Sequence, residues 1–350
     1  MGSSHYTSGY NKGMDPLAHK IADFIQNPPA GDSDAAFEAL ALALFARQYE
    51  CCAPYRRLCD GQGQSPDRVH RWRDIPTVPA QAFKVFDLSC APLFQTVAVF
   101  HSSGTTGPQA SRHFFDADAL ALYETSLRTG FAAAFPDRPR RLWALMPRPQ
   151  AVPHSSLSHM LGALDAHRFF WDADAALVVA LAHVDEPVIL FGTAFAFVQL
   201  FDGTAENWRL PAGSIVIETG GFKGRTREVP REELYTLFGT RLGVPIENCY
   251  SEYGMSEMAS QFYGRGLDPV KRGPHWVRTR AIDPETGEDA APGTPGLLRH
   301  CDLANFNSVG ALQTQDRGML TPDGFVLHGR APDAEMRGCS LTVEELWAKR

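Results

Sequence analysis

Between residues 96 and 242, short runs of β-forming residues alternate with runs of helical periodicity, and this order constrains the fold more than any other feature. A strand followed by a helix can return parallel to its predecessor, with the helix covering one face of the sheet. The pattern predicts strands at 96–100, 141–146, 188–191 and 214–218, and helices at 117–135, 156–166, 195–201 and 231–242. The sequence therefore predicts an α/β body.

Two further patterns flank this stretch. Apolar residues recur at helical spacing from 34 to 49, which predicts an amphipathic helix. After residue 273, Pro and Gly turns separate short strand-like runs at 276–282, 296–300 and 319–327, with a hairpin signal at Asp323-Gly324. We expect an α/β body over residues 14–272 and a β-rich segment over 273–350. Residues 1–13 resemble a vector-derived leader.

Composition excludes several classes of protein. A formal net charge of −7 argues against broad nucleic-acid binding, which needs a dense field of Lys and Arg. The seven cysteines form no CxxC pair, which argues against structural zinc and a disulfide framework and favours a reducing cytoplasm. No apolar run approaches the roughly 20 residues that span a bilayer, and no signal peptide is evident. We expect a cytoplasmic protein without a membrane span.

A loop of hydroxyls and glycines follows the strand predicted at 96–100. Glycine lets the backbone approach an anion, and Ser and Thr hydroxyls add hydrogen-bond donors. No Gly-Lys-Ser/Thr follows, so the loop is not a P-loop, and the alternative is a polar surface turn. The candidate phosphate ligands are Ser102, Ser103, Gly104, Thr105, Thr106 and Gly107.

This loop resembles the SGTTG phosphate loop of the adenylate-forming enzymes, which include acyl-CoA synthetases, luciferases and peptide-synthetase adenylation domains. Further motifs follow in the order found in that superfamily: residues 218–224 (ETGGFKG), 253–257 (YGMSE), Asp316, and Gly329-Arg330. The combination looks most like the acyl-protein synthetases, the fatty-acid activating subunits of bacterial luminescence, with phenylacetate–CoA ligases as close relatives. The resemblance implies an adenylate-forming type of N-terminal body with ATP and Mg²⁺ as cofactors.

The resemblance implies a role for each matched position in holding the nucleoside. Gly220 and Gly221 would lie against adenine, and Tyr253, followed by Gly254 and Met255, would stack on the base. Asp316 would accept hydrogen bonds from the ribose hydroxyls. Taken singly, the tyrosine segment could be a packed turn and the aspartate an ordinary turn acid.

The same resemblance implies a phosphate and metal set. Ser256 would bind phosphate, Glu257 would ligate Mg²⁺ as a hard oxygen donor, and Arg330 would add positive charge near ribose and phosphate. Arg330 could also be an ordinary surface residue. Lys223, after the glycines, is more typically a solvated lysine than one that touches the ligand. His154 could lie near the acyl carboxylate, but a structural histidine is the more typical interpretation.

Two departures bear on the chemistry. Gln109 stands where many members carry a lysine, and the chain ends soon after Glu345, so we expect the mobile C-terminal domain and its lysine to be lacking. In acyl-protein synthetases the acyl group passes to a cysteine near the C-terminus. Cys339 is the candidate here, although a cysteine is also a common small core residue.

The sequence thus predicts an enzyme that activates a carboxylic acid as an acyl-adenylate, releases pyrophosphate and transfers the acyl group to a protein cysteine, a reductase or another carrier. Alternatives are an acyl-CoA ligase of the phenylacetate–CoA ligase type, with CoA as acceptor, and a nucleotide-binding subunit without turnover. Phenylalanines could line an acyl tunnel, but aromatic spacing of this kind is more often that of plain core. They are Phe191, Phe195, Phe197 and Phe201.

Overall fold

The computed structural model describes residues 13–29, 33–102, 110–171, 175–220 and 229–331. Its helices are α1 Pro16–Gln26, α2 Ser33–Cys51, α3 Ala53–Gly61, α4 Ala82–Val85, α5 Ala117–Ala134, α6 Ser156–Ala163, α7 Ala175–His183, α8 Ala194–Gly203 and α9 Arg231–Leu242. Its strands are β1 Val78–Pro79, β2 Ala98–His101, β3 Arg112–Phe115, β4 Arg141–Leu145, β5 Arg168–Phe169, β6 Val188–Thr193, β7 Ile215–Thr219, β8 Cys249–Tyr253, β9 Phe262–Arg265, β10 Val270–Lys271, β11 Val277–Ile282, β12 Gly296–Asp302, β13 Ala311–Thr321 and β14 Gly324–Arg330.

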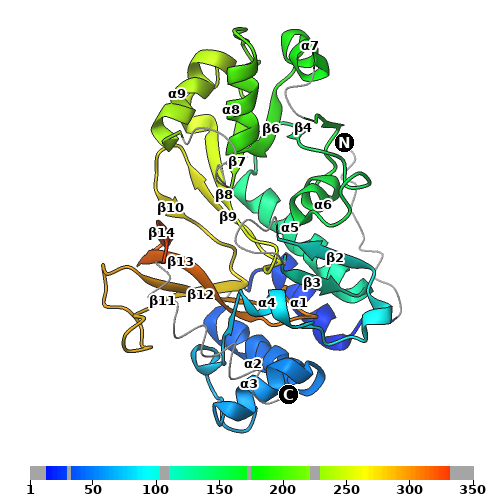
Figure 1. Ribbon diagram of the computed structural model, residues 1–350, viewed down its shortest axis with the longest axis vertical. Coiled ribbons are helices and arrows are strands. Elements are labelled where there is room, and N and C mark those ends of the chain that lie inside the picture. The colour runs from blue at the N-terminus through cyan, green and yellow to red at the C-terminus, as the bar shows by residue number, and fades with distance from the viewer. Residues whose placement is uncertain (1–12, 30–32, 103–109, 172–174, 221–228, 332–350) are drawn as a thin grey trace.

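The first sheet has the strand order β5-β4-β6-β7-β8-β9. Strands β4 to β8 pair in parallel and β9 joins the edge antiparallel to β8. Helices α8 and α9 lie against one side of the sheet and α5 and α6 on the other (Figure 1). This is the α/β architecture that the alternation of strands and helices predicts.

The two faces of the first sheet belong to different apolar clusters, because successive side chains of a strand point to opposite faces. In β4, Leu142 and Ala144 face the larger core that contains α5, whereas Trp143 and Leu145 face the cluster formed with α7, α8 and α9. The sheet is therefore buried on both sides, as a parallel sheet requires.

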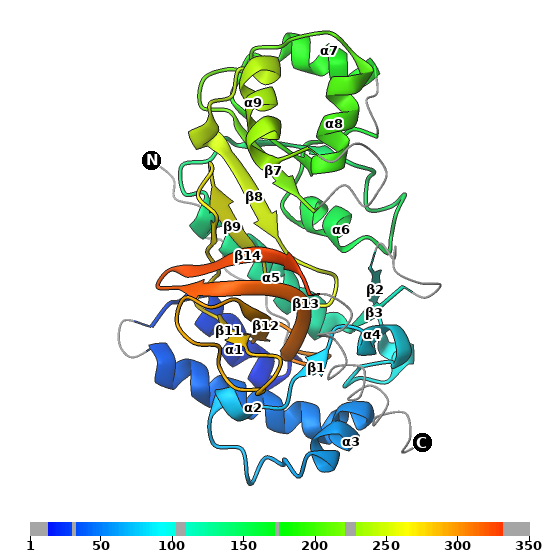
Figure 2. The same cartoon turned by 60° about the vertical axis from the view of Figure 1, so that its left-hand side comes forward.

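The second sheet has the order β10-β14-β13-β12-β11, antiparallel throughout, with β1 added in parallel to β13. In Figure 2 its strands lie between the first sheet and α2. The β13–β14 hairpin turns at Asp323-Gly324, where Thr321 pairs with Gly324, so the predicted hairpin is confirmed. The β-rich C-terminal region is likewise confirmed.

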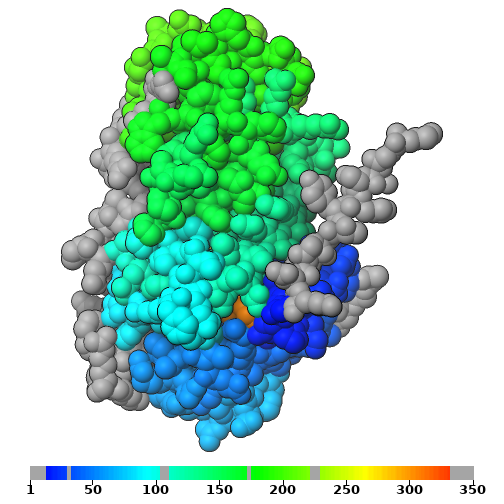
Figure 3. Space-filling model, turned by 90° about the vertical axis from the view of Figure 1, so that its right-hand side faces the viewer, coloured from blue at the N-terminus to red at the C-terminus, as the bar shows by residue number. Residues whose placement is uncertain are grey.

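Helix α2 packs against the turn between β12 and β13 of this second sheet, although it is far from it in sequence. The Gln48 side chain of α2 donates to the carbonyl of Asn305 at 2.8 Å and accepts from the amide of Gly310 at 2.9 Å. Figure 3 shows α1, in dark blue, next to α2, in mid blue, on one face of the molecule. The division after residue 272 stays a prediction, and the segments on its two sides share one large core.

Several sequence predictions hold at the level of single elements. The helix predicted at 231–242 is α9, and the one predicted at 34–49 is α2 with slightly wider bounds. Within the described part of the chain, no helix combines the length and the apolar character that crossing a membrane requires.

Candidate active site

Two neighbouring strands of the first sheet end together at the centre of the molecule. Strands β7 and β8 run in parallel, with Thr219 opposite Glu252. Gly220, the residue after β7, and Tyr253, the last residue of β8, therefore lie side by side. Gly220 has a φ of 65°, a left-handed conformation that side chains other than glycine disfavour. A methyl group at Gly254 would collide with a carboxylate oxygen of Glu252. The backbone conformation therefore favours glycine at position 220, whereas a side chain at position 254 would require Glu252 to move.

Tyr253 joins this strand end to the second sheet. Its hydroxyl donates to Oδ2 of Asp316 on β13 at 2.9 Å, and its ring meets Phe325 at a centroid distance of 5.4 Å and an angle of 79°. Arg330 on β14 faces the same aspartate, with Nε 3.8 Å from Oδ1. The side chain of Arg330 is 66% exposed, so it remains accessible from solvent. Tyr253, Asp316 and Arg330 are thus brought together as the resemblance implies.

Ser256 lies on the other side of Tyr253, beside the strand that leads into the hydroxyl-rich loop. Its hydroxyl donates to the carbonyl of His101 at 3.2 Å and lies 3.3 Å from the hydroxyl of Ser156. Its carbonyl accepts from Nδ1 of His113 at 2.8 Å. These contacts place Ser256 next to the residue before Ser102.

Ser102 pairs with Ser111, the residue before β3. The Ser102 hydroxyl accepts from the amide of Ser111 at 3.0 Å, and the Ser102 amide donates to the Ser111 carbonyl at 3.3 Å. Burial raises the pKa of the Glu257 carboxyl, and the hydroxyl of Ser111 beside it acts in the opposite direction. Ser111 thus contacts Ser102 directly and lies near the carboxyl of Glu257.

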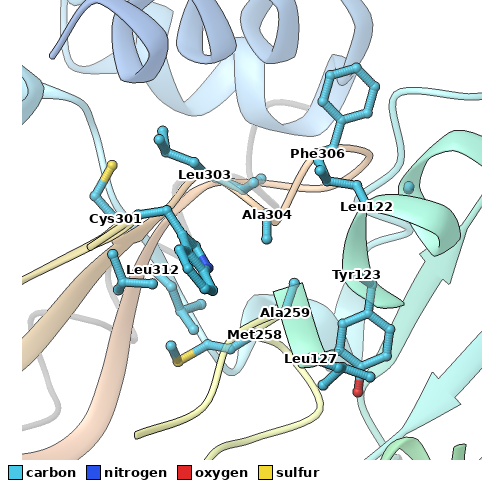
Figure 4. Packing of buried hydrophobic residues seen from close by; sticks show 14 of the residues in the cluster. Leu122, Tyr123, Leu127, Met258, Ala259, Cys301, Leu303, Ala304, Phe306 and Leu312 are labelled. Carbon is cyan, nitrogen blue, oxygen red and sulfur yellow. The ribbon is translucent and has the colours of Figure 1, made fainter. Parts of the chain in front are cut away.

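The backbone around Glu257 is fixed by packing. Met258 and Ala259 lie in the core against residues of α5 and the turn after β12, which Figure 4 shows around Ala304. The carbonyl of Glu257 accepts from Nδ2 of Asn305 at 2.9 Å. These contacts hold the main chain at Glu257 in place.

The charge of Arg330 reaches both halves of the site. Burial raises the pKa values of Asp316 and Glu257, and the Arg330 guanidinium opposes the rise at both. Arg330 thus acts on both groups of candidate residues, directly at Asp316 and more weakly than Lys84 at Glu257. Glu257 supplies one hard carboxylate donor, which suits Mg²⁺, because this ion usually keeps waters and binds through one or two carboxylates plus substrate phosphates.

Some predicted site residues lie outside the described part of the chain. They are Ser103, Gly104, Thr105, Thr106, Gly107, Gly221, Lys223 and Cys339. Met255 packs at the margin of the large core. His154 is exposed, with Nδ1 2.9 Å from the carbonyl of Val99, and its ring stacks on His101 at 4.4 Å.

The phenylalanines with tunnel-like spacing belong mainly to the core. Phe191 and Phe197 are both 0% exposed, and Phe201 is 4% exposed. Phe197 packs edge to face on Phe238 of α9 at 4.8 Å. These three side chains are therefore core residues.

Sequence reasoning missed several residues of the site. His113 and Asn305 hold the backbone carbonyls of Ser256 and Glu257, and Ser111 holds Ser102, but each is a single polar residue without a motif of its own. His101 stands at the start of the loop motif and carries the only sequence signal among the residues missed here.

The fold is similar to that of solved adenylate-forming ligases. 2-Hydroxyisobutyryl-CoA ligase in complex with 2-HIB-AMP has a TM-score of 0.65 at 16% identity, over 93% of this chain and 73% of that chain. An open conformation of the same ligase with 2-HIB-AMP and CoA has a TM-score of 0.66 at 16% identity, covering 93% and 81%. ATP-bound MatB from Rhodopseudomonas palustris has a TM-score of 0.50 at 16% identity, covering 77% of this chain and 56% of that one.

The architecture is thus that of the acyl-adenylate-forming ligases. The family model described as acyl-protein synthetase, LuxE, matches residues 175–348, about half of the chain. We therefore assign the chain to the acyl-protein synthetase family, as the motif order indicated. No curated protein matches the sequence.

Proposed function

We propose that this enzyme activates a carboxylic acid with ATP at the site between β8, β13 and the start of the loop at Ser102, releasing pyrophosphate. The observation that carries the proposal is the meeting of Tyr253, Asp316 and Arg330, which brings an aromatic ring, a carboxylate and a cation together. Together with Glu257, four residues after Tyr253 in the chain, they would offer a base-stacking ring, a ribose acceptor, a cation and a metal ligand.

The reaction needs no general base, because a carboxylate is already ionised at neutral pH and attacks the α-phosphate directly. The barrier comes from bringing two anions together, so positioning and charge neutralisation are the main contributions of the protein. Asp316 would hold the ribose, Ser256 would donate to a phosphate oxygen and Arg330 would stabilise negative charge. Mg²⁺ on Glu257 would neutralise the departing pyrophosphate when bound.

For the second step we propose transfer of the acyl group to a cysteine of the protein, with Cys339 as acceptor. The thiolate sulfur would attack the acyl carbonyl of the adenylate, forming a thioester and expelling AMP with the electron pair of the broken acyl–phosphate bond. Membership of the acyl-protein synthetase family supports this acceptor.

A second candidate acceptor is CoA. The related 2-hydroxyisobutyryl-CoA ligase has been solved with both 2-HIB-AMP and CoA, which favours a thioester on CoA for this fold. The two acceptors predict different products, so they can be separated by following the acyl group.

Pyrophosphate exchange into ATP tests the activation step. With MgATP, labelled pyrophosphate and a panel of carboxylic acids, we expect exchange that depends on one class of acid and on Mg²⁺. Glu257→Ala should abolish it, whereas Glu247→Ala, an exposed residue of a neighbouring segment, should leave it unchanged. An exchange rate in the Glu257→Ala protein equal to that of the wild type would refute the assignment of Glu257 as the metal ligand.

The acceptor is tested with radiolabelled acid in the same mixture. Label that stays on the protein and is lost in Cys339→Ser supports transfer to Cys339. Label that leaves the protein as acyl-CoA only when CoA is present supports the ligase reading. MgATP binding without exchange for any acid would support a nucleotide-binding subunit.

A further inference from the structure

Lys271 is a buried lysine that joins the two sheets beside the candidate active site. It belongs to β10, where it pairs with Phe325 of β14 in the second sheet, and only 6% of it is exposed. Its ammonium reaches the first sheet, where Nζ donates to the carbonyl of Ser251 at 3.2 Å and to the Ser251 hydroxyl. A burial of this kind is costly for an ammonium unless its donors are satisfied.

Ser251 receives a second cation at the same hydroxyl. Arg231 of α9 donates to it through a guanidinium nitrogen at 2.8 Å. Gly264 on β9, opposite Ser251, keeps the space open, because a methyl group there would lie 3.1 Å from this hydroxyl oxygen. Three structural elements therefore converge on one serine of β8.

Two buried carboxylates complete the cluster. Glu218 is opposite Ser251 in β7, and Glu252 is the next residue of β8. Burial raises the pKa of both carboxyls, to about 7 for Glu252, and the Lys271 ammonium opposes both shifts. Burial likewise lowers the pKa of Lys271 to about 8. The cluster holds charges of both signs at the ends of the two strands.

Tyr253 follows this cluster directly along β8. Residues 251 and 252 are held by Lys271 and by the hydroxyl of Thr219, which donates to Glu252. Tyr253 then contacts Asp316 on β13 of the second sheet. The lysine and the tyrosine are thus two successive links between the same strand and the same sheet.

We propose that Lys271 is a positioning residue for nucleotide binding, which holds the end of β8 against the second sheet so that Tyr253 and Asp316 meet around one ATP. This inference rests on the proposed function, because it assumes that ATP binds at this site. Lys271 itself would not touch the nucleotide. Its effect passes through Ser251 to Tyr253. Loss of the lysine therefore weakens ATP binding more than it slows the reaction of bound ATP.

MgATP affinity measured by isothermal titration calorimetry tests the proposal. We expect Lys271→Met to raise the Kd for MgATP about tenfold or more, since hydrogen bonds from a charged group are lost. Ser251→Ala, a smaller change that removes the shared acceptor, should raise it severalfold. Lys20→Met, an exposed lysine on α1, should leave it unchanged. In the exchange assay, Lys271→Met should raise the KM for ATP and leave kcat nearly unchanged.

A double-mutant cycle separates positioning from plain stabilisation. If Lys271 acts through Tyr253, Lys271→Met and Tyr253→Phe together should raise the Kd by less than the product of their separate effects. If Lys271 has only a structural role, Lys271→Met should lower the melting temperature and leave the Kd of the folded protein unchanged. That result would overturn the proposal. If Lys271→Met does not fold, an unchanged Kd in Ser251→Ala overturns it. Absence of MgATP binding in the wild type would instead refute the proposed function.

Discussion

The hydroxyl of Tyr253 donates a hydrogen bond to Asp316 across 63 residues of sequence, at a distance of 2.9 Å. This contact joins the end of a parallel strand to a strand of the second sheet, at the point where Arg330 also approaches Asp316. Because it orders both the ring and the carboxylate, it prepares two of the groups to which we assign nucleotide binding.

Tyr253→Phe tests this preparation. The change keeps the ring and removes the donor to a largely buried carboxylate, so MgATP binding should weaken about tenfold. Fluorescence or calorimetric titration measures the Kd. Tyr49→Phe is the matched control, because Tyr49 donates to Asp60 at 2.6 Å at an exposed position. Equal Kd values in the two variants would contradict the role of the Tyr253 hydroxyl.

Glu257→Gln keeps the volume and removes the negative charge. Since a neutral amide is a poorer ligand for Mg²⁺ than a carboxylate, the Mg²⁺ concentration for half-maximal exchange should rise about tenfold or more. The measurement is a Mg²⁺ titration of the exchange rate at fixed ATP. An unaltered Mg²⁺ dependence would show that the metal is held elsewhere.

His113 should make the protein sensitive to acid. Burial lowers its pKa from 6.5 to about 4, opposed by the carbonyl of Ser256 and the side chain of Asn305. A histidine with a depressed pKa contributes stability that is present above pH 6.5 and is lost as the pH falls through about 4. The unfolding free energy of wild type relative to His113→Asn should therefore drop by about 3 kcal/mol from pH 7 to pH 4.

Urea denaturation at pH 7, 5.5 and 4 measures this difference. Other buried groups, such as His300 and Asp302, titrate in both proteins and cancel in the comparison. A difference that does not vary with pH would contradict a neutral, buried His113.

Phe197→Ala tests whether the aromatic run on α8 is core or acyl tunnel. Phe197 is 0% exposed, so its truncation should lower the unfolding free energy by about 3–5 kcal/mol. Phe94→Ala, at a position that is 86% exposed, should change it by about 0.5 kcal/mol or less. If Phe197→Ala keeps the stability but changes which acid supports exchange, the side chain lines the acyl site.

Periodicity and turn chemistry predicted much of the fold. The helix at 231–242 and the turn at Asp323-Gly324 follow from local sequence alone. Strand β8 was not predicted, because its buried Ser251 and Glu252 break the apolar pattern. Their burial is possible only because polar partners from distant segments satisfy them, and no local rule reports such partners.

The candidate site shows the same limit. Motif order identified Tyr253 and Asp316 separately, and their hydrogen bond emerges only from the packing of two sheets. Lys271 carried no signal, since a single lysine in a sequence is usually solvated and its acceptor lies 20 residues away.

The crystal structure of the complex with MgATP is the most direct test of a single nucleotide site. We predict that the adenine ring lies against Tyr253, that the ribose hydroxyls bond the carboxylate of Asp316, and that the phosphates extend toward Ser256 and Glu257. ATP bound away from these residues, with the Tyr253–Asp316 contact intact and no ligand against it, would contradict the account.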